Sequence, residues 1–254
     1  MADPNINVPI LQVENLTRYF GGLAAVKDVT FEVHRSQIFG IIGPNGAGKT
    51  TLFSMIAGAL KPSAGEIRSL GKNTTTECAH RLVKAGIART HQIVRPFRAL
   101  TVLENVQIGV YFGRKPPSGS AGARESALEV LRLVGIENLA PQPAAILSVG
   151  QQKRLEIARA LATAPELLLC DEICGGLTHA ETGAMLQLLR KIRDKGTTVM
   201  YVEHDVKAIT SVCDRIMVLN YGRKLAEGTP EEIQRDPAVI EAYLGTRTPG
   251  GARE

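Results

Sequence analysis

The segment GPNGAGKT, Gly43 to Thr50, decides the fold because it fits the pattern G-x-x-x-x-G-K-[ST]. The apolar run IFGII precedes it, and the apolar-periodic stretch TLFSMIAGAL follows it. Glycines at this spacing let backbone N–H groups close on phosphate oxygens, and the N-terminus of a helix favours negative charge. The sequence therefore predicts a strand, a phosphate-binding loop and a helix, in that order.

This loop contains most of the candidate binding residues. Lys49 and Thr50 are expected to reach the β- and γ-phosphates of ATP and a Mg²⁺ ion, and Lys49 is also a candidate catalytic residue. The predicted nucleotide-binding positions of the loop are Gly43, Pro44, Asn45, Gly46, Ala47, Gly48, Lys49, Thr50 and Thr51.

Two adjacent acids, Asp171 and Glu172, follow the apolar run Leu167 to Cys170. A short apolar run of this kind indicates a buried strand, which would deliver both carboxylates to the C-terminal edge of a sheet. A phosphate-binding ATPase needs one carboxylate for Mg²⁺ and one group that orients and deprotonates water. We therefore assign Asp171 to the metal and Glu172 to the water.

Composition excludes several classes of protein. The chain has 254 residues, of which 44% are hydrophobic and 22% charged, and it has no apolar run near the ~18 residues that span a bilayer. The start, MADPNINVPI, lacks the pattern of a secretory signal, so a cytoplasmic protein is expected. The net charge of +5 is spread along the chain, so no nucleic-acid partner is expected. The four cysteines form no CxxC pair and are expected to be reduced.

The rest of the sequence divides into strand-like and helix-like patterns. Segments around ILQVENLTRYF and AAVKDVTFEV predict strands in the first third. Apolar residues at three- and four-residue spacing predict helices in RESALEVLRLV, from Arg124, and in QQKRLEIARALA, from Gln151. After Pro165, strands and helices alternate, which predicts a largely parallel sheet flanked by helices.

Two other segments carry local signals. GRKPPSGSAGAR, Gly113 to Arg124, is rich in Gly, Pro and Ser and predicts a mobile surface loop. Thr229 to Glu232 predicts a capping box with proline at the first helical position, and Asp236-Pro237 opens another short helix.

Four further motifs follow the order of a known family. ILSVGQQKRLEIARAL resembles the signature segment of ATP-binding cassette (ABC) transporter subunits, and RTHQ, ending at Gln92, resembles their Q-loop. YVEHD places His204 where the family has its switch histidine, and Phe20 precedes Gly21-Gly22 as the family's adenine-stacking aromatic does. The resemblance covers nearly the whole chain.

The resemblance implies a fold and a division of the chain. The fold is an α/β P-loop NTPase core with a mixed, largely parallel sheet, an N-terminal antiparallel β region and an inserted helical subdomain. Residues 1–90 would form the first part of the core, 91–163 the helical subdomain, 164–245 the second part of the core, and 246–254 a flexible tail.

The resemblance also implies roles for residues outside the phosphate loop. Ser148, Gly150 and Gln151 would cap the γ-phosphate of ATP held by a partner cassette. Gln92 would join the metal site, and His204 would act in catalysis. Phe20 would stack on adenine, although its neighbour Tyr19 could do so instead.

Some positions depart from the family pattern. Val149 replaces the first signature glycine, and Ile173 replaces a usual proline after the two acids. Thr178 and His179 stand where an acid or amide and then a proline are common, in the segment that links the two active sites of a dimer. The substitution of Thr178 predicts altered coupling between those sites.

Among ABC proteins, the chain looks most like cassettes that power uptake of branched-chain amino acids and related amides. The resemblance implies a second cassette, identical or paralogous, permease subunits and, indirectly, a solute-binding protein, with the cassette on the cytoplasmic face of the plasma (inner) membrane. The alternatives are a cassette of a lipopolysaccharide-type export system and a soluble cassette ATPase acting on ribosomes or DNA. A GTPase or small-molecule kinase would leave the signature segment unexplained, and no N-K-x-D sequence is present.

Overall fold

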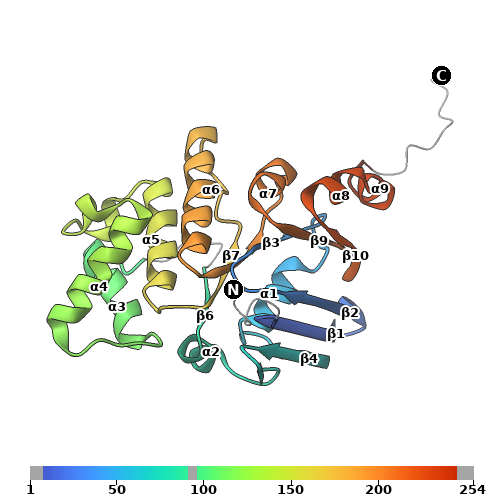
Figure 1. Ribbon diagram of the computed structural model, residues 1–254, viewed down its shortest axis with the longest axis horizontal. Coiled ribbons are helices and arrows are strands. Elements are labelled where there is room, and N and C mark those ends of the chain that lie inside the picture. Colours follow the sequence, from blue (N-terminus) through green and yellow to red (C-terminus); the bar gives the residue numbers. More distant parts are fainter. Residues whose placement is uncertain (1–7, 91–95, 245–254) are drawn as a thin grey trace, which may run out of the picture.

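A six-stranded sheet forms the centre of the chain in the computed structural model, which describes residues 8–90 and 96–244 (Figure 1). Its strand order is β10-β9-β3-β8-β7-β6, and every pairing is parallel except that of β10 with β9. The strands are β3 (Ile38–Ile42), β6 (Ile87–Arg89), β7 (Leu167–Asp171), β8 (Thr198–Val202), β9 (Arg215–Asn220) and β10 (Arg223–Gly228). The predicted mixed, largely parallel sheet is confirmed.

A second, four-stranded sheet is built from the N-terminal part of the chain and has the order β2-β1-β4-β5. All of its pairings are antiparallel, which confirms the predicted antiparallel region. Its strands are β1 (Leu11–Phe20), β2 (Leu23–Val33), β4 (Ala64–Ser69) and β5 (Lys72–Asn73).

The central strands β3, β7 and β8 are almost entirely apolar because both faces of the sheet are buried. Side chains alternate between faces along a strand. In β3, Ile38 and Ile42 join one hydrophobic cluster, whereas Phe39 and Ile41 join the other. This arrangement explains why the run IFGII has no polar alternation and still forms a strand.

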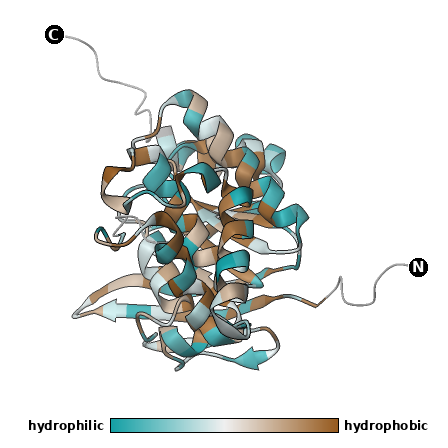
Figure 2. Ribbon diagram, turned by 90° about the vertical axis from the view of Figure 1, so that its left-hand side faces the viewer, coloured by the Kyte–Doolittle hydropathy of each residue, from teal (hydrophilic) through white to brown (hydrophobic). Residues whose placement is uncertain are grey.

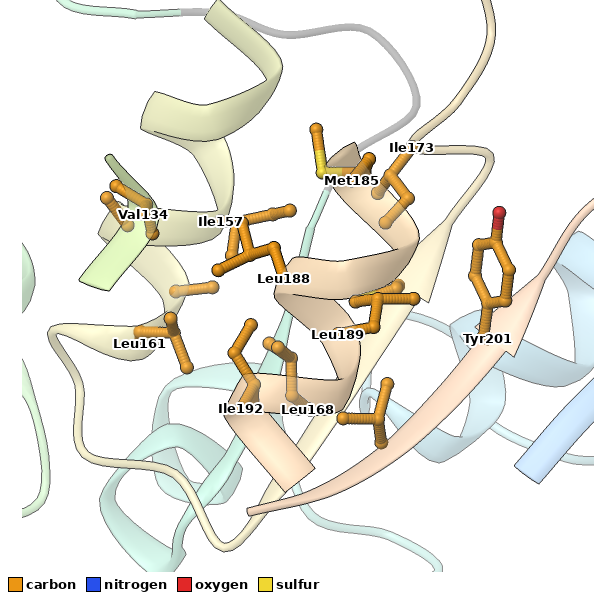
Figure 3. Packing of buried hydrophobic residues seen from close by; sticks show 14 of the residues in the cluster. Val134, Ile157, Leu161, Leu168, Ile173, Met185, Leu188, Leu189, Ile192 and Tyr201 are labelled. Carbon is orange, nitrogen blue, oxygen red and sulfur yellow. The ribbon is translucent and has the colours of Figure 1, made fainter. Parts of the chain in front are cut away.

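Helices cover both faces of the central sheet. On one face, α6 (His179–Asp194) packs against the sheet and against α5 (Val149–Leu161) through Met185, Leu188, Leu189 and Ile192 (Figure 3). The same face carries α7 (Val206–Val212), and the opposite face carries α1 (Lys49–Ile56), which lies near the second sheet (Figure 1). A shorter helix, α2 (Ala79–Ala85), precedes β6.

Ile173, the residue that replaces a usual proline, belongs to this hydrophobic packing. It is 2% exposed and lies beside Met185 of α6 (Figure 3). The side chain at this position therefore contributes to the hydrophobic core directly after the two acids.

A group of helices lies beyond the β6 edge of the sheet (Figure 1). It contains α3 (Val102–Phe112), α4 (Gly119–Val134), α5 and the 3₁₀ turns η1 (Glu137–Leu139) and η2 (Ala144–Ile146). Viewed from this side, hydrophilic and hydrophobic segments alternate along the helices, as expected for helices with one buried face (Figure 2). Their position agrees with an inserted helical subdomain, while the division into domains at the stated boundaries stays a prediction.

The prediction of a loop over Gly113 to Arg124 is wrong for the second half of that segment, which is helical. Helix α4 begins at Gly119, five residues before the periodic pattern from which its start was predicted. Ala123 is fully buried in the main cluster, so tertiary packing overrides the Gly/Ser-rich local composition.

The C-terminal helices match their local signals. Thr229 caps α8 (Pro230–Arg235) in a capping box with Glu232. Asp236 accepts a hydrogen bond from the N–H of Ala238 in the first turn of α9 (Pro237–Leu244). Within residues 8–90 and 96–244, no helix combines the length and the apolar character needed to cross a membrane.

Candidate nucleotide-binding site

The loop between β3 and α1 has the backbone that its glycines predict. Gly43, Gly46 and Gly48 have φ angles of 158°, 80° and 101°, which side-chain-bearing residues rarely adopt. A Cβ atom on Gly48 would also lie 2.3 Å from the carbonyl oxygen of Ala25 in β2. The loop is therefore held tightly against the second sheet, and glycine is required at position 48 for two reasons.

We expect Gly48→Ala to lower the free energy of unfolding more than Gly71→Ala. Gly71 has a φ angle of 75° and open space around it, so alanine there adds only conformational strain, about 1–2 kcal/mol. Alanine at 48 adds that strain and the steric clash with Ala25. Denaturant unfolding of both variants without nucleotide measures the difference, and equal losses would contradict the tight packing of the loop.

A cavity of about 340 Å³ lies over the start of α1 and is lined by four separate segments of the chain. Its walls include the phosphate loop, Glu172 after β7 and His204 after β8. These strands are neighbours in the sheet, so their C-terminal ends meet at one edge. The full lining is Ala25, Asn45, Gly46, Ala47, Gly48, Lys49, Thr50, Thr51, Glu172 and His204.

The Lys49 ammonium lies inside the loop. Its Nζ donates hydrogen bonds to the carbonyl oxygens of Gly43 at 2.6 Å and Pro44 at 3.0 Å. Burial lowers the pKa of Lys49, while the carboxylates of Glu172 and Asp171 oppose that shift. Phosphate oxygens entering the cavity would offer this amine anionic acceptors in place of neutral carbonyls, and hydrogen bonds to charged acceptors are stronger.

Asp171 is 1% exposed and forms an ion pair that the sequence analysis missed. Its Oδ2 lies 2.7 Å from Nη2 of Arg89, and Nη1 of Arg89 donates to Oγ of Ser54 in α1 at 3.0 Å. Arg89 is the last residue of β6, which pairs directly with β7. The available signal was a basic residue ending a short apolar stretch, GIAR, and only the strand order shows its partner.

The surroundings of Asp171 fit a Mg²⁺ ion. Its Oδ1 is buried and has no hydrogen-bond partner within the described part of the chain. No group of three or more His, Cys, Asp or Glu side chains there could hold a metal unaided. Magnesium commonly takes one or two carboxylates and completes its shell with water and substrate phosphates. A single buried carboxylate oxygen near a phosphate-binding loop suits that pattern.

Glu172 and His204 contact each other directly. Glu172 Oε1 lies 2.5 Å from His204 Nε2. Glu172 has a φ angle of 49°, in the left-handed region, and its carbonyl oxygen accepts a hydrogen bond from Nζ of Lys153 in α5 at 2.9 Å. A hydrogen bond from α5 thus supports the unusual backbone conformation of Glu172.

The signature residues lie at the exposed start of α5 and do not line the cavity. Ser148 and Gln151 form a capping box: Ser148 Oγ accepts from the N–H of Gln151 at 3.3 Å, and Gln151 Oε1 accepts from the N–H of Ser148 at 2.9 Å. Gly150 packs against the Glu181 side chain, whose Oε1 would have to shift to admit a Cβ, because the two atoms would lie 2.6 Å apart. The segment therefore presents a helix N-terminus, with Val149 55% exposed beside it.

Phe20 also lies outside the cavity lining. Its side chain is 48% exposed, and the Arg18 guanidinium lies over its ring at 4.9 Å from the centroid. Tyr19 is similarly exposed, at 43%. Gln92, expected in the metal site, lies outside the described residues.

Thr178 forms the N-cap of α6. Its hydroxyl accepts from the N–H of Glu181 at 3.3 Å and donates to the Glu181 carboxylate at 2.8 Å. In the single chain this hydroxyl is therefore engaged in a capping box, and its effect on coupling between two sites stays a prediction.

Comparison with known proteins supports the motifs. Residues 26–175 match a family model described as ABC transporter, and residues 223–248 match one described as branched-chain amino acid ATP-binding cassette transporter. The chain is 40% identical over 253 residues to BraF of Pseudomonas aeruginosa, a high-affinity branched-chain amino acid transport ATP-binding protein, covering 93% of this chain and 98% of BraF.

Among solved structures, the chain is similar to ATP-binding cassettes. The ADP conformation of MJ1267, an ATP-binding cassette of an ABC transporter, matches with a TM-score of 0.85 and 31% identity, covering 94% of this chain and all of that one. A dimeric post-hydrolysis state of the cassette MJ0796, bound to ADP and Pi, matches with a TM-score of 0.78 and 30% identity. The match covers 87% of this chain and 98% of the MJ0796 chain.

The fold and site define a nucleotide-binding ATPase of the P-loop class. The chain belongs to the ABC transporter family. It is an ATPase subunit that resembles the cassettes of branched-chain amino acid importers.

Proposed function

We propose that this cassette powers the uptake of branched-chain amino acids or related amides through a membrane permease. The cavity that joins the phosphate loop to Glu172 and His204 supports ATP hydrolysis. The solute class is supported by the match of residues 223–248, because this C-terminal part of the chain lies outside the general cassette model.

The working unit has a second cassette, identical or paralogous, and permease subunits, on the cytoplasmic face of the membrane. A solute-binding protein acts on this assembly indirectly, and no nucleic-acid partner is involved. The exposed signature residues support the second cassette, because a helix N-terminus that does not face its own cavity is free to meet the nucleotide of another subunit. Ser148, Gly150 and Gln151 contact that nucleotide.

The binding residues act on the phosphates. The backbone N–H groups of the loop from Gly43 to Thr51 surround the phosphates, and Lys49 donates to the β- and γ-phosphate oxygens. Thr50 and Asp171, with Gln92, would hold Mg²⁺. When bound, this ion neutralises phosphate charge and polarises the bond that breaks.

The catalytic residues act on the water. Glu172 orients the attacking water and accepts its proton at a carboxylate oxygen. His204 holds the Glu172 carboxylate through its Nε2 atom, which the 2.5 Å contact supports. Two such sites, closed between two cassettes, would pull on the permease helices and release them after hydrolysis.

The ATPase activity of the assembled transporter tests the solute class. We expect a binding protein loaded with leucine, isoleucine or valine to stimulate hydrolysis, while binding proteins for unrelated solutes do not. Stimulation by lipopolysaccharide would instead support the export alternative. Full activity of the cassette on its own, unchanged by any permease, would favour the soluble ATPase.

We expect Phe20→Ala to weaken ATP binding and leave the maximal rate nearly unchanged. An aromatic ring contacts adenine equally in the ground and transition states, so its loss raises KM without lowering kcat. The expected loss of binding free energy for ATP is about 1–2 kcal/mol. Tyr19→Ala is the matched variant, because the two rings are adjacent and similarly exposed. A raised KM in Tyr19→Ala alone would transfer the stacking role to Tyr19.

A further inference from the structure

The buried carboxylate of Glu203 joins the two segments that carry Glu172 and His204. Glu203 follows β8 and is 5% exposed. Its Oε1 accepts a hydrogen bond from the backbone N–H of Cys174 at 2.8 Å, and its Oε2 accepts one from the backbone N–H of His204 at 3.1 Å. Each oxygen therefore holds a different loop at the same edge of the sheet.

The turn after β7 needs such support. Glu172 is in the left-handed backbone region, and Cys174 follows two residues later. The thiol of Cys174 also lies 3.2 Å from the hydroxyl of Tyr201 in β8, and the N–H of Glu172 donates to the carbonyl oxygen of Val202 at 3.0 Å, so several contacts tie the turn to the neighbouring strand. Because strained backbone persists only where its surroundings fix it, these contacts act with the hydrogen bond from Lys153 to set where the Glu172 side chain points.

A contribution to the stability of the fold does not by itself explain why a carboxylate stands at position 203. Burial raises the pKa of Glu203, and the hydrogen bonds from the Cys174 and His204 backbones oppose that shift. An apolar side chain would fill the same space without desolvating a charge. What it could not supply is a pair of acceptors that fixes two backbone N–H groups relative to each other.

We propose that Glu203 is a positioning residue for ATP hydrolysis. It holds the turn after β7 against the loop after β8, so that the Glu172 carboxylate and the His204 ring meet. Glu203 is not among the residues that line the cavity, so it acts through the backbone and not on the nucleotide. The inference rests on the proposed function of Glu172 and His204.

Glu203→Gln is the informative variant because it keeps the size of the side chain and replaces one acceptor oxygen with an N–H₂ donor. That donor faces a backbone N–H, so one of the two ties is lost. We expect kcat for ATP to fall about 10- to 100-fold, since small displacements of catalytic groups have effects of this size. KM and the affinity for Mg-ATP should stay within about twofold, because binding residues are untouched.

Glu166→Gln is the matched control. Glu166 also joins separate elements, through ion pairs with Arg35 and Arg114, but it precedes β7 and lies at the opposite end of that strand from Glu172. This variant should keep wild-type kcat. Thermal unfolding of both variants shows whether any loss of activity follows a loss of stability.

A double-mutant cycle with His204→Ala separates positioning from a general structural effect. If Glu203 acts by bringing His204 to Glu172, adding Glu203→Gln to His204→Ala should lower kcat by less than about twofold further. If the loss of kcat in the double variant equals the product of the losses in the two single variants, Glu203 does not act through His204.

Wild-type kcat in Glu203→Gln would overturn the inference, as would a fall in kcat matched by an equal rise in KM. If Glu172→Gln abolishes hydrolysis while Glu203→Gln retains it, only the positioning role fails. A wild-type chain that hydrolyses no ATP at saturating protein concentration would contradict the proposed function as well.

Discussion

Glu172→Gln is expected to bind ATP with near wild-type affinity and to hydrolyse it at least about 100-fold more slowly. The amide has the same size and can still hydrogen-bond water, but it cannot accept the proton. Two observations motivate the expectation: Glu172 lines the cavity beside the phosphate loop, and its carboxylate contacts His204. Single-turnover hydrolysis, with nucleotide binding measured separately, distinguishes the chemical step from affinity.

Glu227→Gln provides the control for this change. Its side chain is 18% exposed, against 15% for Glu172, and it pairs with Arg215 and Lys224 on the β9–β10 hairpin, outside the cavity lining. We expect it to hydrolyse ATP at the wild-type rate. Comparable turnover in Glu172→Gln and the wild type would remove Glu172 from the role of base.

Lys49→Ala is expected to weaken nucleotide binding itself. A hydrogen bond to a charged group contributes about 1.5–3 kcal/mol, which corresponds to about 10- to 150-fold in affinity. The ammonium already lies inside the loop, held by the carbonyls of Gly43 and Pro44, so little reorganisation separates it from bound phosphate. Direct titration with an ATP analogue measures the loss.

Lys72→Ala removes the same charge from an exposed position on β5, remote in the chain from the phosphate loop. Its affinity for the analogue should match that of the wild type. If Lys49→Ala bound as tightly as Lys72→Ala, the assignment of the phosphate-binding loop would be wrong.

Much of the fold could be predicted because local signals and tertiary structure agree. The glycines of GPNGAGKT have the backbone that a phosphate-binding loop requires, and Thr229 and Asp236 cap the expected helices. The start of α4 could not be predicted in this way. The Gly- and Ser-rich residues before Arg124 favour a loop locally, and only the buried contacts of Ala123 make that stretch helical.

Site residues could be predicted when their position after an apolar run was enough to identify them. Residues whose role depends on which strands are adjacent could not be predicted. Asp171, Glu172 and His204 each follow an apolar run, so the sequence brings them to one edge. Arg89 and Glu203 also stand at strand ends, but their partners come from neighbouring strands. No local pattern specifies which strands are adjacent.

The ion pair of Arg89 with Asp171 bears on the order in which ligands arrive. The guanidinium balances the charge of the buried carboxylate, so the pair is close to electroneutral. A divalent cation entering alone would be repelled by that positive charge at short range, whereas a cation bound to the phosphates of ATP arrives in a complex of net negative charge, which the guanidinium attracts. We therefore expect the ion and the nucleotide to enter as a single complex, and free Mg²⁺ to bind the empty subunit only weakly.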